Sequence, residues 1–428
     1  MAYIPVDLVE VLAWGDRVGA IAAGRQRDTW VFEYDPSWIA RGIEIAPALL
    51  PLARTLYAFP GYPAETYQGL PPPLADSLPD RFGNSIVDAW LARNGVAPEQ
   101  ITALDRLAYL GERGMGALQF RPDRTPSLPP PTALDLSQLV VSARRAVHGS
   151  LATENESQAA LRRIIEVGTS AGGARAKAIV NVDPDSGELR SGHVPPPPGF
   201  EAWLLKFDGV GRDEQLGPGL GYGRVEYAYS LMARAAGIHM SETRLLEEHD
   251  RAHFMTRRFD RLADGGRLHM LTLCGMDGLD FNAIGVNDYA QLFGRILGLG
   301  LGQDALLEAF RRMAFNVVAA NCDDHTKNHA FLMSPDGTWS LAPAYDVTHA
   351  FAPGHRWLSQ HLMSVNGRFE EITRADLMQV ADRFGIERAA VTLGEVRDAV
   401  DSWSQFASVA GLSGEHAAAL ARDFRLVT

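Results

Sequence analysis

The feature that most constrains how this chain folds is a polar run at residues 321–329, set between two apolar segments. Upstream, apolar residues recur at helical spacing, which predicts a helix that ends near Ala320. Downstream, two short apolar runs flank a turn at residues 334–337, and this arrangement predicts a β-hairpin that leads the chain back to Asp346. We therefore expect the polar loop and Asp346 to lie at one place in the fold.

Three side chains of this segment have the types and the spacing that phosphoryl transfer requires. Asp323 lies five positions before Asn328, and Asp346 follows eighteen positions after Asn328. Phosphoryl transfer needs a carboxylate that accepts the proton of the attacking hydroxyl, and oxygen ligands that hold Mg²⁺ on the phosphates of ATP. Asp323 fits the first role, and Asn328 and Asp346 fit the second. The alternative is structural, because Asp and Asn often only cap helices and fill turns.

A lysine and a glutamate upstream fit the same chemistry. Lys206 lies near the end of an apolar strand at residues 203–207, and Glu226 lies twenty residues later on a predicted helix that ends at Gly237. In kinase folds a strand lysine binds the phosphates of ATP and is held by a helix glutamate. A plain ion pair, or two solvated charges, is the alternative for these two residues.

A Gly-rich run at residues 168–177 precedes a predicted strand at residues 178–182. Small residues there would let backbone N–H groups approach a phosphate closely. The run is neither a Walker A sequence nor the usual kinase GxGxxG, and a simple hairpin turn is the alternative. Further along, residues 253–261 predict a strand whose backbone could meet an adenine ring, with Phe259 either stacking nearby or packing in the core.

Charge and cysteine content exclude several classes of protein. The net charge of −12 and the pI of about 5.5 argue against direct binding to a nucleic-acid backbone. The two cysteines, Cys274 and Cys322, exclude a disulfide framework and a Cys-rich zinc site, and suit the cytoplasm. We expect no signal peptide and no membrane span, because the start has no basic flank before an apolar run and no uncharged apolar stretch reaches about 18 residues.

The pattern along the chain predicts an α+β protein of two or three lobes. Strands at residues 9–13 and 29–34 and helices around residues 85–91 and 104–110 come first, and the pattern is mainly helical from about residue 285. The Pro-rich run at residues 121–131 predicts a linker. The predicted domains are an N-terminal subdomain at residues 1–125, a lobe with the Gly-rich loop and Lys206 at residues 126–265, and a helical lobe at residues 266–428.

Six motifs, taken in order, resemble the HipA family of bacterial toxin kinases. They lie at residues 170–177, 204–206, 226–227, 258–261, 323–328 and 344–346. The amino-terminal part is similar to the first subdomain of that family at residues 17–20, 32–34, 78–80 and 114–118. The resemblance covers roughly residues 5 to 390, and the order of the six motifs is far more specific than any one of them.

The resemblance implies a Ser/Thr protein kinase with a bilobal, phosphatidylinositol-kinase-like core, an added N-terminal α/β subdomain and a mainly helical C-terminal lobe. Carried over by position, Asp323 would be the catalytic aspartate, and Asn328 and Asp346 would hold Mg²⁺. The residues that would contact ATP are Ser170, Ala171, Gly172, Gly173, Ala174, Lys206, Arg257, Phe259, His325 and Lys327, with Glu226 as the partner of Lys206. Ser170 also occupies the position of an inhibitory autophosphorylation site in this family.

The resemblance also implies partners. Members of the family are typically neutralised by a small helix-turn-helix antitoxin of the HipB type, which itself binds operator DNA. This chain would then meet DNA only indirectly, through the antitoxin. Its own substrate would be a protein of translation, such as an aminoacyl-tRNA synthetase.

Two departures from the family pattern keep other functions open. Arg257 stands at the presumed hinge where the well-known member of the family has an acidic residue, and residues 271–278 lack the usual Glu-Asp-Phe/Met-Cys-Gln run. A catalytically silent regulator that binds nucleotide and antitoxin therefore remains an alternative. A small-molecule or lipid kinase is another, although a lipid substrate is less favoured because the chain has no basic membrane-facing cluster.

Overall fold

The computed structural model describes residues 4–26, 28–79, 81–93, 95–124, 176–192, 196–208, 221–249, 251–425 and 427. The chain divides into two compact units. The strand-rich unit comprises residues 1–220, 246–271 and 333–338, and the helix-rich unit comprises residues 221–245, 272–332 and 339–428. The mixed α and β content agrees with the predicted class, whereas the three predicted domain ranges stay a prediction. Most of the predicted linker, and residues 168–175 of the predicted Gly-rich run, lie outside the described residues.

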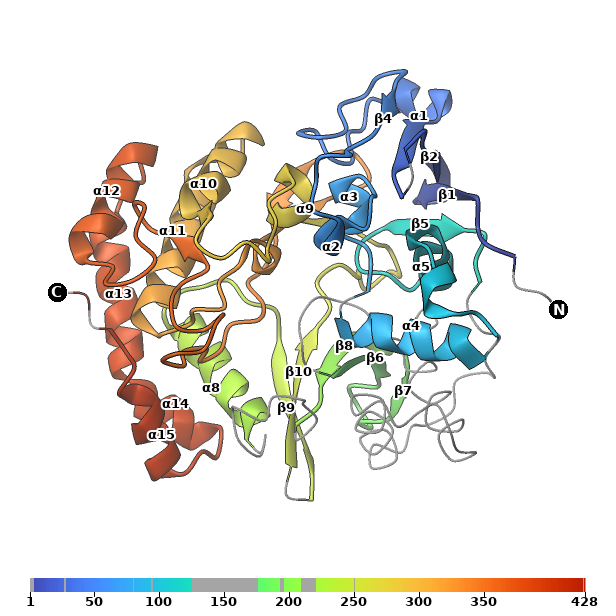
Figure 1. Ribbon diagram of the computed structural model, residues 1–428. Helices are drawn as coiled ribbons and strands as arrows, with labels where there is room; N and C mark the ends of the chain where they lie inside the picture. Colours follow the sequence, from blue (N-terminus) through green and yellow to red (C-terminus); the bar gives the residue numbers. More distant parts are fainter. Residues whose placement is uncertain are drawn as a thin grey trace. The chain divides into compact units, whose positions relative to one another are not determined.

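The first sheet of the strand-rich unit is built from the amino-terminal residues, in the order β4-β3-β2-β1-β5 (Figure 1). Its strands are β1 (Leu8–Ala13), β2 (Asp16–Ala23), β3 (Trp30–Tyr34), β4 (Leu56–Tyr57) and β5 (Leu118–Arg121). The helical segments of this region are α1 (Pro36–Arg41), α2 (Ala64–Tyr67), α3 (Pro72–Ala75), α4 (Arg81–Arg93), the short η1 (Pro98–Gln100) and α5 (Ala103–Leu110). The two predicted strands and the two predicted helices are confirmed.

Strand β2 was not predicted, because its Ala and Gly residues have low β-propensity. Its glycine is nevertheless required by the packing of the sheet. A Cβ atom on Gly19 would lie 2.2 Å from the carbonyl oxygen of Glu33 on β3, far inside van der Waals contact. Gly19 therefore allows the close approach of two backbones that holds the middle of the sheet together.

The second sheet has the order β7-β6-β8-β10-β9 and places Lys206 on a central strand. Its strands are β6 (Lys177–Val182), β7 (Leu189–Ser191), β8 (Glu201–Lys206), β9 (Thr243–Glu248) and β10 (Arg251–Arg257). The chain passes between the two units within β9 and again within β11 (His269–Thr272). Lys206 is the last residue of β8, as predicted, and faces Lys177 on one side and Phe254 on the other in the strand register.

A buried cluster ties the segment after β10 to the segment before β5. Asp260 is fully buried and accepts hydrogen bonds from Arg258 Nη2 at 2.7 Å, Arg261 Nη1 at 2.7 Å and the backbone N–H of Gly116 at 2.6 Å. Both arginines also donate to the carbonyl oxygen of Gly114. Burial alone raises the pKa of Asp260, but the two guanidinium groups outweigh it and hold this pKa well below its ordinary value. The cluster gives part of the 258–261 motif a structural role.

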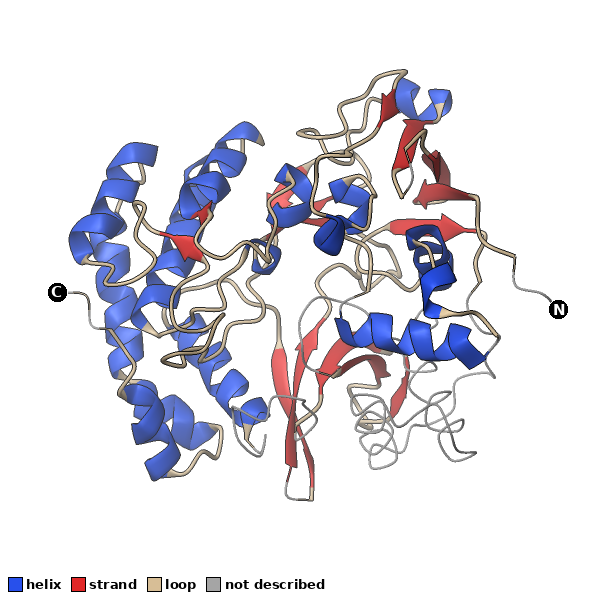
Figure 2. Ribbon diagram, viewed as in Figure 1, coloured by secondary structure: helices blue, strands red, loops and turns tan. Residues whose placement is uncertain are grey.

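Helices dominate the second unit, as Figure 2 shows for α8 and α10 to α15. They are α8 (Tyr222–Ala235), α9 (Leu273–Asp277), α10 (Tyr289–Gly298), α11 (Gly302–Val318), the short η4 (Thr326–Asn328), α12 (Arg374–Phe384), α13 (Ala389–Asp401), α14 (Trp403–Val409) and α15 (Gly414–Ala421). The remaining strands among the described residues are β12 (Asn287–Asp288), β13 (Ala330–Met333), β14 (Trp339–Leu341) and β15 (Met363–Ser364). The predicted hairpin is confirmed, since β13 and β14 are neighbours in a sheet.

Aromatic side chains form the centre of the helix-rich core. Tyr229 of α8 is fully buried, with its ring 6.2 Å from that of Phe315 on α11 and 5.3 Å from that of Trp403 on α14. Its hydroxyl donates to the carbonyl oxygen of Ala319 at 2.6 Å, just where α11 ends. This bond satisfies a carbonyl at the helix terminus and fixes the point from which the polar loop departs.

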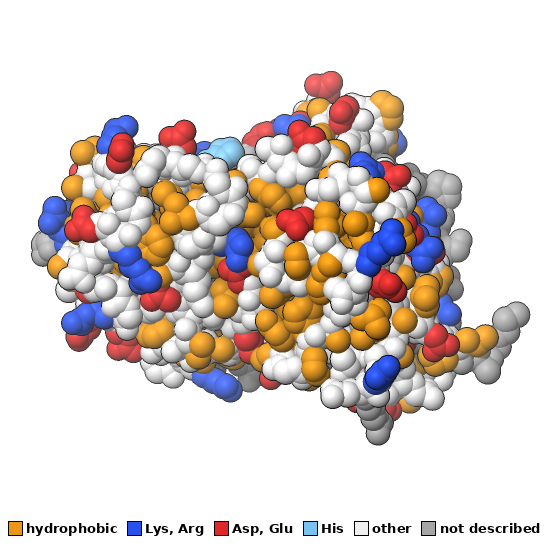
Figure 3. All heavy atoms as spheres, turned by 90° about the horizontal axis from the view of Figure 1, so that it is seen from above, with side chains coloured by type: hydrophobic (Ala, Val, Ile, Leu, Met, Phe, Trp, Pro, Cys, Tyr) orange, Lys and Arg blue, Asp and Glu red, His pale blue; other side chains and the backbone are white. Residues whose placement is uncertain are grey.

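Within the described part of the chain, none of the helices has both the length and the apolar character needed to span a bilayer. On the face drawn in Figure 3, Lys and Arg side chains are interspersed with Asp and Glu and do not gather into one basic area.

Candidate active site

The polar loop begins where α11 ends. The helix stops at Val318, and Ala320 adopts a left-handed backbone conformation with φ of 53°, which turns the chain out of the helix direction. Asn321 then pairs with Ala350 in a parallel bridge, and its backbone N–H donates to the carbonyl oxygen of Asn316 at 2.9 Å. The predicted helix end near Ala320 is confirmed, and the loop leaves it in a fixed direction.

Within the loop, Asn328 is held against Asp323 by a direct hydrogen bond. The Asn328 side-chain N–H donates to the backbone carbonyl oxygen of Asp323 at 2.6 Å, and a short 3-10 turn at Thr326–Asn328 closes the loop. A carbonyl can only accept, so the amide of Asn328 must present its nitrogen to Asp323. The Oδ1 oxygen of Asn328 is thereby left as the atom available to a cation. The Asp323 carboxylate itself is 47% exposed, with His325 Nε2 at 3.8 Å.

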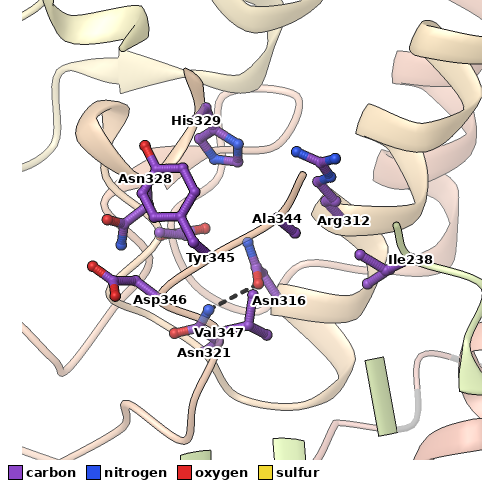
Figure 4. Close-up of a pocket in the computed structure, with 11 residues that line it drawn as sticks. Ile238, Arg312, Asn316, Asn321, Asn328, His329, Ala344, Tyr345, Asp346 and Val347 are labelled. Atoms are coloured by element: carbon purple, nitrogen blue, oxygen red, sulfur yellow. Dashed lines mark hydrogen bonds between the residues drawn. The ribbon is translucent and has the colours of Figure 1, made fainter. Parts of the chain in front are cut away.

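Asp346 reaches the same pocket from the other end of the hairpin. Its backbone is left-handed, with φ of 52°, a conformation that costs a non-glycine residue about 1 kcal/mol or more and is common at functional sites. The preceding Tyr345 donates its hydroxyl to the carbonyl oxygen of Lys327 at 2.5 Å. Figure 4 shows the side chains of Asn328 and Asp346 on the same side of this pocket. The expected meeting of the polar loop and Asp346 is therefore observed.

Further polar side chains, together with a few apolar ones, complete the lining of the pocket. Its lining residues are Ile238, Arg312, Asn316, Asn321, Asp324, Asn328, His329, Ala344, Tyr345, Asp346 and Val347. Arg312 is buried and held by Glu308 at 2.8 Å and by the carbonyl oxygen of Ala342 at 2.9 Å. Burial, followed by the charge of Arg312, lowers the pKa of His329 to about 3. His329 is therefore neutral at pH 7, and neither ring nitrogen has a hydrogen-bond partner among the described residues.

A phenylalanine orders the two basic residues of the loop. The ring of Phe281 lies 5.4 Å from that of His325, and the Lys327 ammonium lies 4.9 Å from its centroid. The loop that carries Phe281 is fixed to the polar loop, because Thr326 donates its hydroxyl to the carbonyl oxygen of Leu279 at 3.0 Å. Sequence reasoning singled out His325 and Lys327 but missed Phe281, since no local pattern marks an aromatic residue more than forty positions away.

A buried polar network below the loop was also missed. Asp324 is 1% exposed and is contacted by Tyr289 of α10 and by His361, which precedes β15. Burial lowers the pKa of His361, but the Asp324 carboxylate outweighs it and raises this pKa to about 10 overall. Burial and then the same carboxylate raise the pKa of Tyr289 well above its ordinary value. The one local signal for this network is a second aspartate directly after Asp323.

The remaining predicted site residues belong mostly to the strand-rich unit. Lys206 lies at the end of β8, with its ammonium 5.7 Å from the ring centroid of Phe254. Arg257 ends β10, and one guanidinium nitrogen lies 3.2 Å from a carboxylate oxygen of Glu201. Phe259 is half-buried, two residues after β10.

Two predictions about the lysine and the phosphate loop stay predictions. Glu226 is buried on α8 of the helix-rich unit, whereas Lys206 belongs to the other unit, so their pairing is still a prediction. The predicted phosphate loop with Ser170, Ala171, Gly172, Gly173 and Ala174 lies outside the described residues.

The donor set of the pocket fits Mg²⁺ better than a transition metal. Asn328 supplies an amide oxygen and Asp346 a carboxylate, and the described residues contain no cluster of three or more His, Cys, Asp or Glu side chains that could hold an ion. Mg²⁺ is usually bound by one or two carboxylates together with substrate phosphates and water, not by an all-protein cage. Two oxygen ligands at one side of a pocket are what such an ion requires from the protein.

Comparison with known proteins assigns the chain to a family. A model of the HipA N-terminal domain matches residues 9–121, and a model of the HipA-like C-terminal domain matches residues 169–404. The second match alone covers more than half of the 428 residues. The chain belongs to the HipA family. The resemblance found in the sequence motifs is thus confirmed.

Two similar proteins illustrate the likeness. The protein Y4dM of Sinorhizobium fredii, named as a candidate kinase, is 27% identical over 141 residues, which is 28% of this chain and 32% of Y4dM. The chain thus matches only about a third of the length of this relative. HipA of Shewanella oneidensis MR-1, solved with HipB and its operator DNA, is 14% identical, with a TM-score of 0.64 over 97% of this chain and 94% of that one. This likeness shows a shared fold.

Proposed function

We propose that this HipA-family protein is an ATP-dependent Ser/Thr protein kinase and the toxin of a toxin–antitoxin pair. The observation that supports this most directly is the pocket of the helix-rich unit. There, Asn328 and Asp346 present two oxygen ligands, and Asn328 is hydrogen-bonded to Asp323, whose carboxylate remains half exposed. These are the parts that phosphoryl transfer to a hydroxyl requires from a protein.

In this proposal each side chain of the loop has one task. Asp323 accepts the proton of the attacking hydroxyl as the γ-phosphoryl group is transferred. Asn328 and Asp346 would hold Mg²⁺, which when bound would neutralise charge on the phosphate oxygens. Lys327 and His325 lie beside the nucleotide, and their common contact with Phe281 keeps both side chains from moving away.

From the resemblance to the HipA family alone, we also propose roles in ATP binding for residues of the strand-rich unit. Lys206, paired with Glu226, would bind the phosphates, and Arg257 and Phe259 would lie beside the adenosine. The contact between Arg257 and Glu201 offsets the unusual positive charge at this position. The small residues of the Gly-rich run, from Ser170 to Ala174, would cover the phosphates. Autophosphorylation of Ser170 would add negative charge there and oppose ATP binding.

The proposed partners follow from the family. The Shewanella HipA structure contains HipB and operator DNA. We propose a HipB-like helix-turn-helix antitoxin for this chain, with DNA reached only through that antitoxin, in keeping with the net charge of −12. The proposed substrate is a protein of translation, such as an aminoacyl-tRNA synthetase, and the proposed compartment is the cytoplasm.

Transfer of labelled phosphate tests this function. The purified chain is incubated with Mg²⁺ and ATP labelled in the γ-phosphate, alone and with a bacterial lysate. We expect label in the chain itself and in a lysate protein, and loss of both in Asp346→Asn. Asp382→Asn, which makes the same chemical change at an exposed position of α12, should keep full activity. Binding of Mg²⁺ and ATP without any transfer would contradict the kinase and support the silent regulator instead.

A further inference from the structure

The residue directly after Asp323 is held by three buried hydrogen bonds from distant parts of the chain. Asp324 Oδ2 accepts from the Tyr289 hydroxyl at 2.8 Å and lies 2.9 Å from His361 Nδ1. Its other oxygen, Oδ1, accepts from the backbone N–H of Leu362 at 2.8 Å. The side chains of Asp324 and His361 are both 0% exposed. A buried carboxylate with three donors has a single preferred position, because each donor restricts it in a different direction.

One donor of this carboxylate, Tyr289, is itself held by a residue of helix α11. Asn316 donates its side-chain N–H to the Tyr289 hydroxyl at 2.9 Å, and Asn321 donates to the side-chain oxygen of Asn316 at 2.9 Å. Tyr289 therefore accepts from Asn316 and has its own proton left to donate to Asp324. The hydrogen bonds run in one direction, from Asn321 through Asn316 and Tyr289 to Asp324. A change at one residue therefore alters the hydrogen bond made by the next.

The contacts of Asp324, together with a hydrogen bond of Tyr345, attach a long segment of the chain to the polar loop at both ends. Tyr345 is bound to the Lys327 carbonyl at one end, and His361 and Leu362 are bound to Asp324 at the other. The segment from Tyr345 to Leu362 is thus attached at both ends to the six residues 323–328. Asp346, one of the two proposed metal ligands, is the second residue of that segment.

We propose that Asp324 and His361 form a positioning clasp, which holds the segment carrying Asp346 against the loop carrying Asp323 and Asn328. The clasp deepens the function proposed above and rests on it, since its task is to keep two metal ligands at one separation. Both carboxylate oxygens of Asp324 are engaged with protein donors, so in this proposal the pair positions the metal ligands and does not contact the reacting atoms. Their effect passes through the backbone on either side, and displacement of a reacting group by about 1 Å can cost a hundredfold in rate.

The charges around the clasp support an ion pair. His361 faces Asp324, whose carboxylate also accepts from Tyr289, and the thiol of Cys322, and the raised pKa of its imidazole means that it is protonated at pH 7. An imidazolium facing a buried carboxylate makes a stronger hydrogen bond than a neutral donor does. At position 361, a neutral side chain of similar length can supply a hydrogen bond to Asp324 without supplying a positive charge. The contribution of the hydrogen bond and that of the charge can therefore be tested separately.

The test uses the full-length chain with three substitutions. His361→Leu removes the clasp, His361→Gln keeps a neutral donor, and Ser230→Ala removes a buried hydrogen bond to Thr243 elsewhere in the same unit as a control for general loosening. Two quantities are measured at a temperature where all variants are folded by circular dichroism. One is the affinity for Mn²⁺ with ATP, followed by water-proton relaxation, and the other is kcat for phosphate transfer.

We expect His361→Leu to weaken Mn²⁺ binding in the presence of ATP by about fivefold or more and to lower kcat by about tenfold or more. His361→Gln should recover most of both losses, and Ser230→Ala should change neither. The clasp is wrong if folded His361→Leu binds Mn²⁺ with ATP as wild type does, or if Ser230→Ala loses as much as His361→Leu does. If His361→Leu does not fold, Asp324→Asn takes its place with the same expected losses.

The two measurements separate this inference from the proposed function. A wild-type chain that binds Mn²⁺ with ATP but transfers no phosphate contradicts the kinase, while the Mn²⁺ affinities of the variants still decide the clasp. A wild-type chain that transfers phosphate, with a His361→Leu variant of unchanged affinity and kcat, contradicts the clasp alone. Failure of the wild-type chain to bind Mn²⁺ with ATP contradicts both.

Discussion

The pair formed by Asp324 and His361 makes a specific prediction about stability at alkaline pH. The pKa of His361 is about 10 in the folded chain, against about 6.5 in an unfolded one. Below pH 6.5 both states are protonated, and the stabilisation by the ion pair is fully present. Between pH 6.5 and 10 the folded state holds one proton more than the unfolded state, so the free energy of unfolding must fall as the pH rises.

The magnitude follows from the same difference in pKa. Each pH unit in this window removes about 1.4 kcal/mol from the free energy of unfolding, or about 4 kcal/mol between pH 6.5 and 9.5. The group is fully buried, so solvent does not screen this effect. Other groups also titrate above pH 8. The informative quantity is therefore the difference between wild type and His361→Gln, in which this titration is absent and the rest is unchanged.

Urea unfolding measures that difference. Midpoints for the two proteins are determined by tryptophan fluorescence at half-unit steps from pH 6 to 9.5, with the slope of the urea dependence held common. We expect wild type to be more stable at pH 6 and the two curves to converge as the pH rises. A difference that is constant across the whole range would refute the ion pair, because it would mean that His361 binds no extra proton in the folded state.

Further predictions concern buried groups on the acid side and in the strand-rich unit. Burial lowers the pKa of His269 to about 4. Burial, together with the charge of Arg312, lowers the pKa of His329 to about 3. As the pH falls below about 6.5, each of these two histidines should therefore lower the free energy of unfolding by about 1.4 kcal/mol per pH unit. In His269→Gln, the melting temperature should fall less steeply than in wild type as the pH is lowered below about 6.5. An unchanged dependence of the melting temperature on pH would contradict a neutral buried imidazole. Asp260→Asn leaves buried guanidinium groups without their countercharge and should lower stability by about 3 to 5 kcal/mol in thermal unfolding, whereas exposed Asp185→Asn should change it little. If Asp260→Asn and Asp185→Asn lowered stability equally, Asp260 would not act as the countercharge of the buried guanidinium groups.

The parts of the site that could be predicted from sequence are those built from nearby residues. Asp323 and Asn328 share one loop, and the hairpin that leads to Asp346 is fixed by turn residues only a few positions apart. Local signals of this kind need no knowledge of tertiary contacts. Helix α8 was predictable for the same reason, since its apolar stripe and its end at Gly237 are both local.

The parts that could not be predicted depend on contacts between distant residues. His361 meets Asp324 across 37 positions, and no periodicity or spacing marks that encounter. Phe281 reaches Lys327 in the same way. Strand β2 was missed for a different reason, because Gly19 is unfavourable for a strand by propensity but is demanded by the neighbouring backbone. Tertiary packing overrides local preference at such a position.

The measurement that tests the central claim most directly is phosphate transfer by Asp323→Asn. The substitution preserves shape and leaves the backbone carbonyl that binds Asn328 in place, but it removes the proton acceptor. We predict a loss of about a hundredfold or more in kcat, while the affinity for Mn²⁺ with ATP stays within about threefold of wild type. A folded Asp323→Asn protein that transfers phosphate at the wild-type rate would contradict the assignment of this loop as the catalytic loop of a kinase.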